Sequence, residues 1–133
     1  EGGDLQRQVA VAWQTFAQGR RDAGISQLSA AADAEDATDK AAVTPGPIAP
    51  ARELLGYMLL DAGRPADALA AFETTMKKEP NRFRSTYGAA RAAEMAGDRA
   101  RAQGYYRQLL EIAREADSSR PEIVGARGFV GNQ

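Results

Sequence analysis

The chain has 133 residues and a net charge of −1 at pH 7, and its charged residues, 26% of the total, are mixed in sign. It contains no cysteine and no histidine, which excludes disulfides, cysteine nucleophiles, the usual zinc sites and the commonest general base. The balanced charge argues against nucleic acid as a partner, and no apolar run approaches the roughly 18 residues of a membrane span. We expect one domain with no metal, no cofactor and no membrane span in it.

The first part of the chain, "VAWQTFAQGRRDAGISQLSAAADAED" (11–36), has small and apolar residues at helical spacing. The residues that mark this pattern are Ala12, Gly19, Gly24, Leu28 and Ala31. They predict two helices, at about 4–18 and 21–33.

An acidic run, "DAEDATDK" (33–40), comes next. Its acidic residues are Asp33, Glu35, Asp36 and Asp39. Carboxylates suit a hard cation such as calcium, but the alternating ligand pattern and the central glycine of an EF-hand are missing. We therefore expect a solvated helix end, where Lys40 offsets the unfavourable position of acids near a helix C-terminus.

The stretch "AAVTPGPIAP" (41–50) places three prolines and a glycine between helical segments. Its prolines forbid a helix and favour an extended loop, while Pro50 can start the next helix. Gly19 and Gly63 lie 44 residues apart, whereas 34 residues separate Gly63 from Gly97. The excess predicts a ten-residue insertion at 39–48 rather than a linker between domains.

The following segments repeat each other with an offset of 34 residues. "LLDAGRPADALAAFETTMKKEPNR" (59–82) lies over "EMAGDRARAQGYYRQLLEIAR" (94–114), so that Phe72 matches Tyr106. A fixed period of helical pairs is a strong sign of a stacked array. The predicted helices of the two pairs are 50–62, 65–79, 83–96 and 98–115.

Small residues explain how each pair closes. Gly56 and Ala90 allow the second helix to approach the first, and the aromatic residue of the second helix, Phe72 in the first of these pairs, fills the remaining gap. Gly63 and Gly97 can end the first helices because glycine accepts a left-handed backbone cheaply.

A last short helix is predicted at 120–130, in "SSRPEIVGARGFV". Ser119 and Glu122 have capping-box spacing, and Ile123, Ala126 and Val130 share one helical face. This helix should cover the exposed end of the stack.

The repeats resemble the tetratricopeptide repeat (TPR) family. The matching residues of the first repeat are Leu55, Gly56, Leu59, Gly63, Ala68, Phe72 and Pro80, and those of the second are Ala89, Ala90, Ala93, Gly97, Ala102, Tyr106 and Leu109. At the early tryptophan position of the family, the chain has Arg52 and Thr86 instead. The resemblance implies an all-α fold, a right-handed α-α superhelix of about three TPR helix pairs plus a C-terminal capping helix. We expect a single domain, 1–133, with repeats at about 5–38, 49–82 and 83–114, the inserted loop at 39–48 and the capping helix at 120–130.

The segment around the Val-Thr-Pro-Gly-Pro loop also resembles the C-terminal TPR segment of uncharacterised bacterial proteins. Such proteins are often exported, and the first residue here is Glu1 rather than methionine, so we expect a processed product or a fragment. The localisation stays open between export and the cytoplasm. Ala41 and Ala42 stand where a polar or histidine-bearing dipeptide often precedes the valine, which argues against a metal site in this loop.

The resemblance implies that the first helix of each pair lines a concave groove. Helical spacing then selects the residues that are free of packing duties. The candidate peptide-binding residues are Trp13, Glu53, Tyr57, Arg84, Tyr87 and Arg91. Arginine suits carboxylates because its planar donors bind both oxygens, and tyrosine and tryptophan are frequent in binding hot spots. Two alternatives stay open: the arginines pair with Glu53, Glu94 or Asp61, and Trp13 belongs to the core.

These residues favour a protein- or peptide-binding scaffold whose partner is a segment with an acidic group. The alternative is a structural module that completes a longer array or forms a homo-oligomer. The carboxylate-clamp class of the family is disfavoured, because Glu53 and Tyr57 stand where it has a lysine and an asparagine. An enzyme is disfavoured as well, because no phosphate loop or nucleophile elbow is present.

Overall fold

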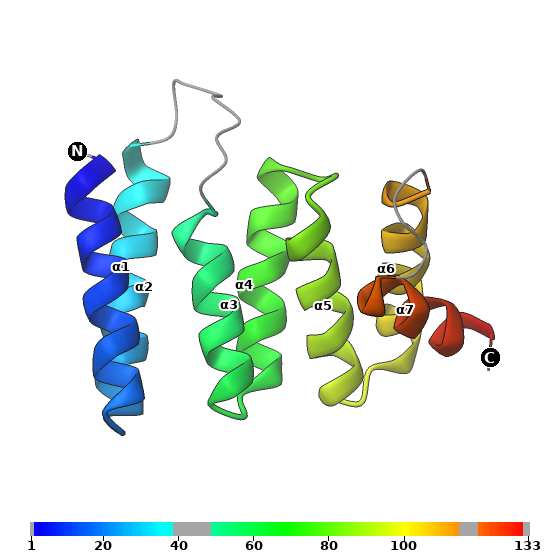
Figure 1. Ribbon diagram of the computed structural model, residues 1–133, viewed down its shortest axis with the longest axis horizontal. Helices are drawn as coiled ribbons and strands as arrows, with labels where there is room; N and C mark the ends of the chain where they lie inside the picture. Colours follow the sequence, from blue (N-terminus) through cyan, green and yellow to red (C-terminus); the bar gives the residue numbers. More distant parts are fainter. Residues whose placement is uncertain (1, 39–48, 115–119, 132–133) are drawn as a thin grey trace.

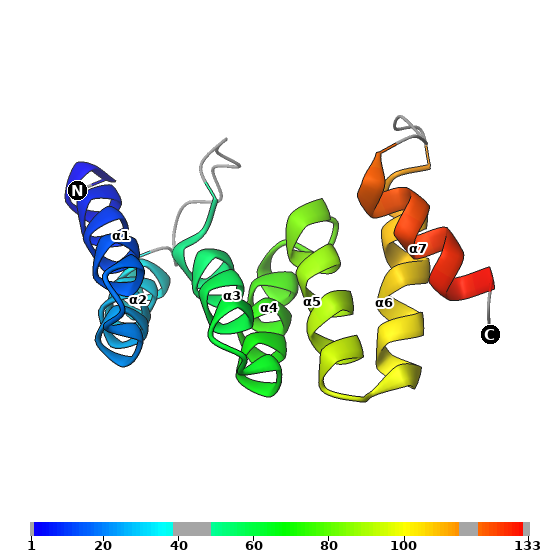
Figure 2. The same ribbon diagram turned by 60° about the horizontal axis from the view of Figure 1, so that its bottom comes forward.

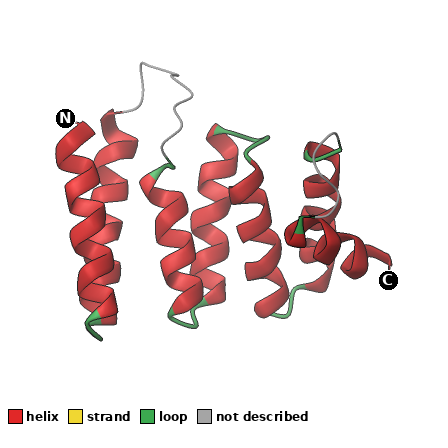
Figure 3. Cartoon of the chain, viewed as in Figure 1, coloured by secondary structure: helices red, strands yellow, loops and turns green. Residues whose placement is uncertain are grey.

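The computed structural model describes residues 2–38, 49–114 and 120–131, and every regular element within them is a helix (Figures 1 and 3). The helices are α1 (Gly2–Ala17), α2 (Arg21–Thr38), α3 (Ala51–Asp61), α4 (Pro65–Lys78), α5 (Phe83–Met95), α6 (Arg99–Ile112) and α7 (Pro121–Gly131). The all-α prediction is confirmed. The expected bounds agree closely except in α2, which continues about one turn beyond the predicted end at residue 33.

The helices stand in a row, and each packs mainly on the helix before and the helix after it (Figures 1 and 2). The two ends of the chain consequently lie at opposite ends of the row (Figure 1). Such an array has no central core, so its stability is a sum of contacts between neighbours. Direct contact between α3 and α5 ties successive helix pairs together.

Phe72 of α4 is the packing centre of the middle of the row. Its side chain is fully buried, and it lies between Gly56 of α3 and Gly88 of α5. A Cβ atom at Gly56 would lie 2.7 Å from the phenyl ring, and one at Gly88 would lie closer still. The close approach expected at Gly56 is therefore present, and Gly88 provides a second one that the sequence analysis did not identify.

Glycines end the first helix of each pair. Gly19, Gly63 and Gly97 have φ angles of 93°, 76° and 86°, which is the left-handed region. After Gly97, the carboxylate of Asp98 accepts a hydrogen bond of 3.1 Å from the backbone N–H of Arg101 and caps α6. These turns follow from local sequence, as expected.

The inserted loop at 39–48 and the capping box at Ser119 lie outside the described residues. The division of the chain into repeats stays a prediction. Among the helices that the structure describes, none is long and apolar enough to cross a membrane.

Candidate functional site

Four of the predicted site residues lie on two neighbouring helices. They are Tyr57 of α3 and Arg84, Tyr87 and Arg91 of α5, which we call the tyrosine–arginine strip. The hydroxyl of Tyr57 donates a 2.6 Å hydrogen bond to the backbone carbonyl of Arg84, and the Arg84 guanidinium lies 5.0 Å from the centre of the Tyr57 ring. Burial raises the pKa of Tyr57 far above its ordinary range, so this hydroxyl stays a neutral donor at physiological pH.

Arg91 repeats this arrangement two turns along α5. Its guanidinium lies 5.9 Å from the centre of the Tyr87 ring, and its Nη1 donates to the Tyr87 hydroxyl at 3.5 Å. Both arginines are exposed, and neither forms an ion pair with a carboxylate of the described residues. The strip therefore presents two cations whose charge is not neutralised by a direct partner there.

Glu53 is not part of this surface, which corrects the prediction that it faces a ligand. Its side chain is only 1% exposed. Arg82 Nε donates to Oε1 at 2.7 Å and Arg82 Nη2 donates to Oε2 at 3.2 Å, while Ser85 Oγ donates to Oε1 at 2.5 Å. The carboxylate joins α3 to the start of α5, because partners from that helix satisfy the charge inside the protein.

Trp13 lies on α1, at the far end of the row from the strip's second arginine (Figure 1). Its half-buried ring makes an edge contact with Phe16, with centroids 5.7 Å apart, and packs against the core. This environment favours the core interpretation of Trp13 over a role as a ligand platform.

A cavity of about 460 Å³ opens between α5, α6 and α7, next to the strip. Its lining residues are Tyr87, Arg91, Glu94, Tyr106, Pro121, Gly125, Gly128 and Phe129. The hydroxyl of Tyr106 donates to Glu94 Oε1 at 2.7 Å, and the rings of Tyr106 and Phe129 lie 4.9 Å apart. Sequence reasoning missed this site because the cavity depends on how α7 lies against α6; the signal that was available is the three-residue spacing of glycines in α7.

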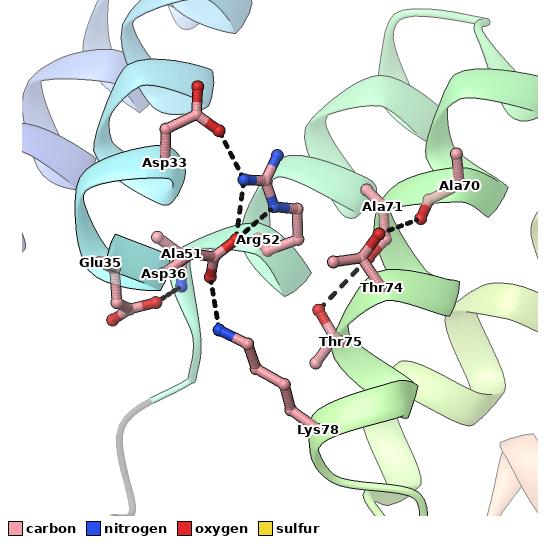
Figure 4. A network of polar contacts seen from close by, with 10 residues as sticks. All are labelled: Asp33, Glu35, Asp36, Ala51, Arg52, Ala70, Ala71, Thr74, Thr75 and Lys78. Carbon is pink, nitrogen blue, oxygen red and sulfur yellow. Dashed lines mark hydrogen bonds and ion pairs between the residues drawn. The ribbon is translucent and has the colours of Figure 1, made fainter. Parts of the chain in front are cut away.

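The acidic residues at the end of α2 form a polar network with the next helix pair (Figure 4). Arg52 Nη2 lies 2.6 Å from Asp33 and 2.8 Å from Asp36, and Lys78 Nζ lies 3.1 Å from Asp36. Glu35 Oε1 accepts a 2.7 Å hydrogen bond from the backbone N–H of Ala51.

This network corrects the expectation of a solvated helix end, because partners from α3 and α4 hold the last turns of α2. Asp39 and Lys40 lie outside the described residues. Within those residues, no group of three or more acidic side chains is placed to hold a metal ion.

Comparison with known proteins supports the sequence pattern. Residues 59–120 match the model of the tetratricopeptide repeat family. Residues 59–120 belong to that family. A tetratricopeptide array explains why the helices alternate in pairs and why each pair contacts only its neighbours.

Two solved structures share this TPR fold. One is PcrH from Pseudomonas aeruginosa, with a TM-score of 0.74 and 15% identity over 99% of this chain and 92% of PcrH. The other is PcrH in complex with the chaperone binding region of PopB, with a TM-score of 0.72 and 16% identity over 97% of this chain and 96% of that one. At this identity the likeness shows the fold alone. The comparison with curated protein sequences finds no match.

Proposed function

We propose that the chain is a non-catalytic scaffold that binds a protein or peptide segment along the face formed by α3 and α5. The observation that carries this proposal is the tyrosine–arginine strip, in which two exposed arginines are held against tyrosine rings without a carboxylate partner in the described structure. Stacking on a ring restricts each guanidinium, so less freedom is lost when a ligand binds. The TPR fold supports this role, since PcrH has the same fold and its structure contains a bound segment of PopB.

The spacing of the arginines indicates what the segment should contain. Arg84 and Arg91 are seven residues apart on one helix, which corresponds to roughly 10 Å along its axis. An extended segment advances about 3.3 Å per residue, so acidic residues about three positions apart would reach both guanidinium groups. Each could then form a bidentate pair with a carboxylate.

A second candidate function is self-association or completion of a longer array. It is favoured by apolar side chains exposed on the first and last helices of the row, Val11 of α1 at 46% and Val124 of α7 at 55%. A module of this kind would bury these helices in contacts with other copies or other repeats. Its mass in solution would then rise with concentration.

The test of the main proposal is a peptide array probed at low and at moderate salt. We expect the native chain to bind acidic peptides more tightly at low salt, because exposed charges are screened as salt rises. The variant Arg84→Ala, Arg91→Ala should lose about tenfold or more in affinity, as expected for hot-spot arginines. The matched control is Lys77→Ala, Arg107→Ala, which removes the same charge from exposed positions on α4 and α6 and should bind normally.

Two results would count against the proposal. Equal losses in the two double variants would mean that net charge, not the strip, attracts the peptides. Binding by none of the three proteins, together with a mass that rises with concentration, would favour the self-association module instead.

A further inference from the structure

The cavity between α5, α6 and α7 differs in character from the open strip beside it. Its volume of about 460 Å³ lies in the range of cavities that enclose a small ligand or a large side chain. Aromatic rings from three different helices line it, namely Tyr87 of α5, Tyr106 of α6 and Phe129 of α7. Arg91 belongs both to this lining and to the strip, so the two sites adjoin.

The wall that α7 contributes is made of glycine. Gly125 and Gly128 line the cavity, and a Cβ atom at either position would meet nothing within 4 Å. Gly56 and Gly88 are different, because there the ring of Phe72 occupies the space of a side chain. Glycine inside a helix costs stability relative to alanine, and the described contacts of the chain give no packing reason for that cost in α7.

The polar groups of the lining limit what can enter. The hydroxyl of Tyr106 is already used, since it donates to Oε1 of Glu94. Arg91 offers only donors, and Glu94 offers an acceptor, so the charges at the mouth oppose each other. A neutral, flat side chain that stacks on the rings fits these walls better than a second charged group does.

We propose that this cavity takes one aromatic side chain of the acidic segment that binds the strip. The inference rests on the proposed function and adds a position to it. An aromatic residue enters between Tyr87 and Phe129, and an acidic residue farther along the segment pairs with Arg84. Buried aromatic anchors surrounded by polar contacts are typical of the residues that dominate binding energy.

Two probes separate the cavity from the strip. The first is indole, followed through the backbone amide NMR signals of Gly125 and Gly128. The second is a set of acidic peptides of equal length, in pairs that differ only in tryptophan or alanine at one position. We expect indole to shift both glycine signals, and the tryptophan peptide of the best pair to bind about tenfold or more tightly than its alanine counterpart.

The blocking variant is Gly128→Leu, which fills the cavity from α7. The φ angle of Gly128 is not in the left-handed region and its side-chain space is open, so the variant should fold with an unchanged or raised melting temperature. Its matched control is Gly104→Leu on α6, where a Cβ atom also meets nothing within 4 Å and which does not line the cavity. Gly128→Leu should abolish the indole shifts and the preference for tryptophan, and Gly104→Leu should preserve both.

The outcomes distinguish the two proposals. If acidic peptides bind but tryptophan gives no advantage and indole shifts neither glycine, the aromatic anchor is wrong and the strip remains a binding site. If indole binds in the cavity but no acidic peptide binds, the proposed function fails while the preference of the cavity for aromatic groups stands. If Gly128→Leu keeps the full preference for tryptophan, the anchor lies elsewhere and the inference is overturned.

Discussion

Arg52 and Glu53 are adjacent on α3, yet they join this helix to opposite sides of the array. Arg52 reaches back to Asp33 and Asp36 of α2, in a network where its own side chain is 18% exposed and that of Asp33 is 70% exposed. Glu53 reaches forward to Arg82, and it is 1% exposed while Arg82 is 21% exposed. Both contacts are ion pairs between helix pairs, but they differ in their access to water.

That difference decides what each ion pair contributes. A charge in water is already well solvated, so an exposed pair gains little when it forms. A buried carboxylate has no water to return to, so the loss of its partners or of the carboxylate itself leaves an uncompensated group. We therefore expect the junction around Glu53 to be sensitive to substitution and the junction around Arg52 to be tolerant.

The largest effect is expected for Glu53→Ala. This change removes the acceptor of Arg82 and Ser85 and leaves a small cavity, which should lower the free energy of unfolding by about 3 kcal/mol. Denaturant unfolding measures it. The matched control is Glu79→Ala, which removes the exposed and more distant partner of Arg82 at 3.9 Å and should cost little. Similar losses in the two variants would show that the burial of Glu53 does not matter.

Gly56→Leu should be the next most damaging change. The new side chain would overlap the ring of Phe72, which is fully buried and cannot move aside without disturbing α5. Overpacking of this kind costs roughly 1–3 kcal/mol, measured as a lower melting temperature. Gly104→Leu, at an open helical position, should leave the melting temperature unchanged or raise it. An unchanged melting temperature in Gly56→Leu would contradict the close packing at the centre.

Arg52→Ala should cost about 1 kcal/mol or less at low salt, since it removes a partly exposed network. The loss should shrink as salt is added, because screening weakens the native network but has no effect on the variant's missing contacts. Arg114→Ala breaks an exposed pair within a single helical segment and should have almost no effect. A loss as large as that of Glu53→Ala would remove the distinction between the two junctions.

The smallest effect is a dependence of the first junction on pH. Burial by itself raises the pKa of Asp36, but hydrogen bonds from Arg52 and Lys78 and their positive charges lower it more, so the net pKa lies below the ordinary value. A lowered pKa in the folded protein contributes stability above the pKa of the unfolded chain, near pH 4, and this stability is lost as pH falls further. The difference in melting temperature between the native chain and Asp36→Asn should therefore narrow from pH 6 toward pH 3, about the range where this carboxylate takes up its proton. A constant difference would exclude Asp36 as the responsible group.

The part of the site that the sequence predicted depends on spacing within one helix or between two adjacent repeats. Arg84, Tyr87 and Arg91 share a face of α5 because helical geometry places residues three, four and seven apart together. Tyr57 holds the corresponding position on α3, and the structure brings it against Arg84. Whether these residues bind a segment stays a prediction.

Short-range rules alone determined the helices, the turns at Gly63 and Gly97 and the period of 34 residues, because backbone preferences and apolar spacing act over one or two helical turns. The burial of Glu53 depended on Arg82 and Ser85, which are 29 and 32 residues away in the chain. The extended α2 depended on Arg52 and Lys78 in the same way, and the cavity depended on how α7 lies against α6. Only the tertiary structure decided these features, since the cost of a charge, a glycine or a gap depends on which helix comes to lie against it.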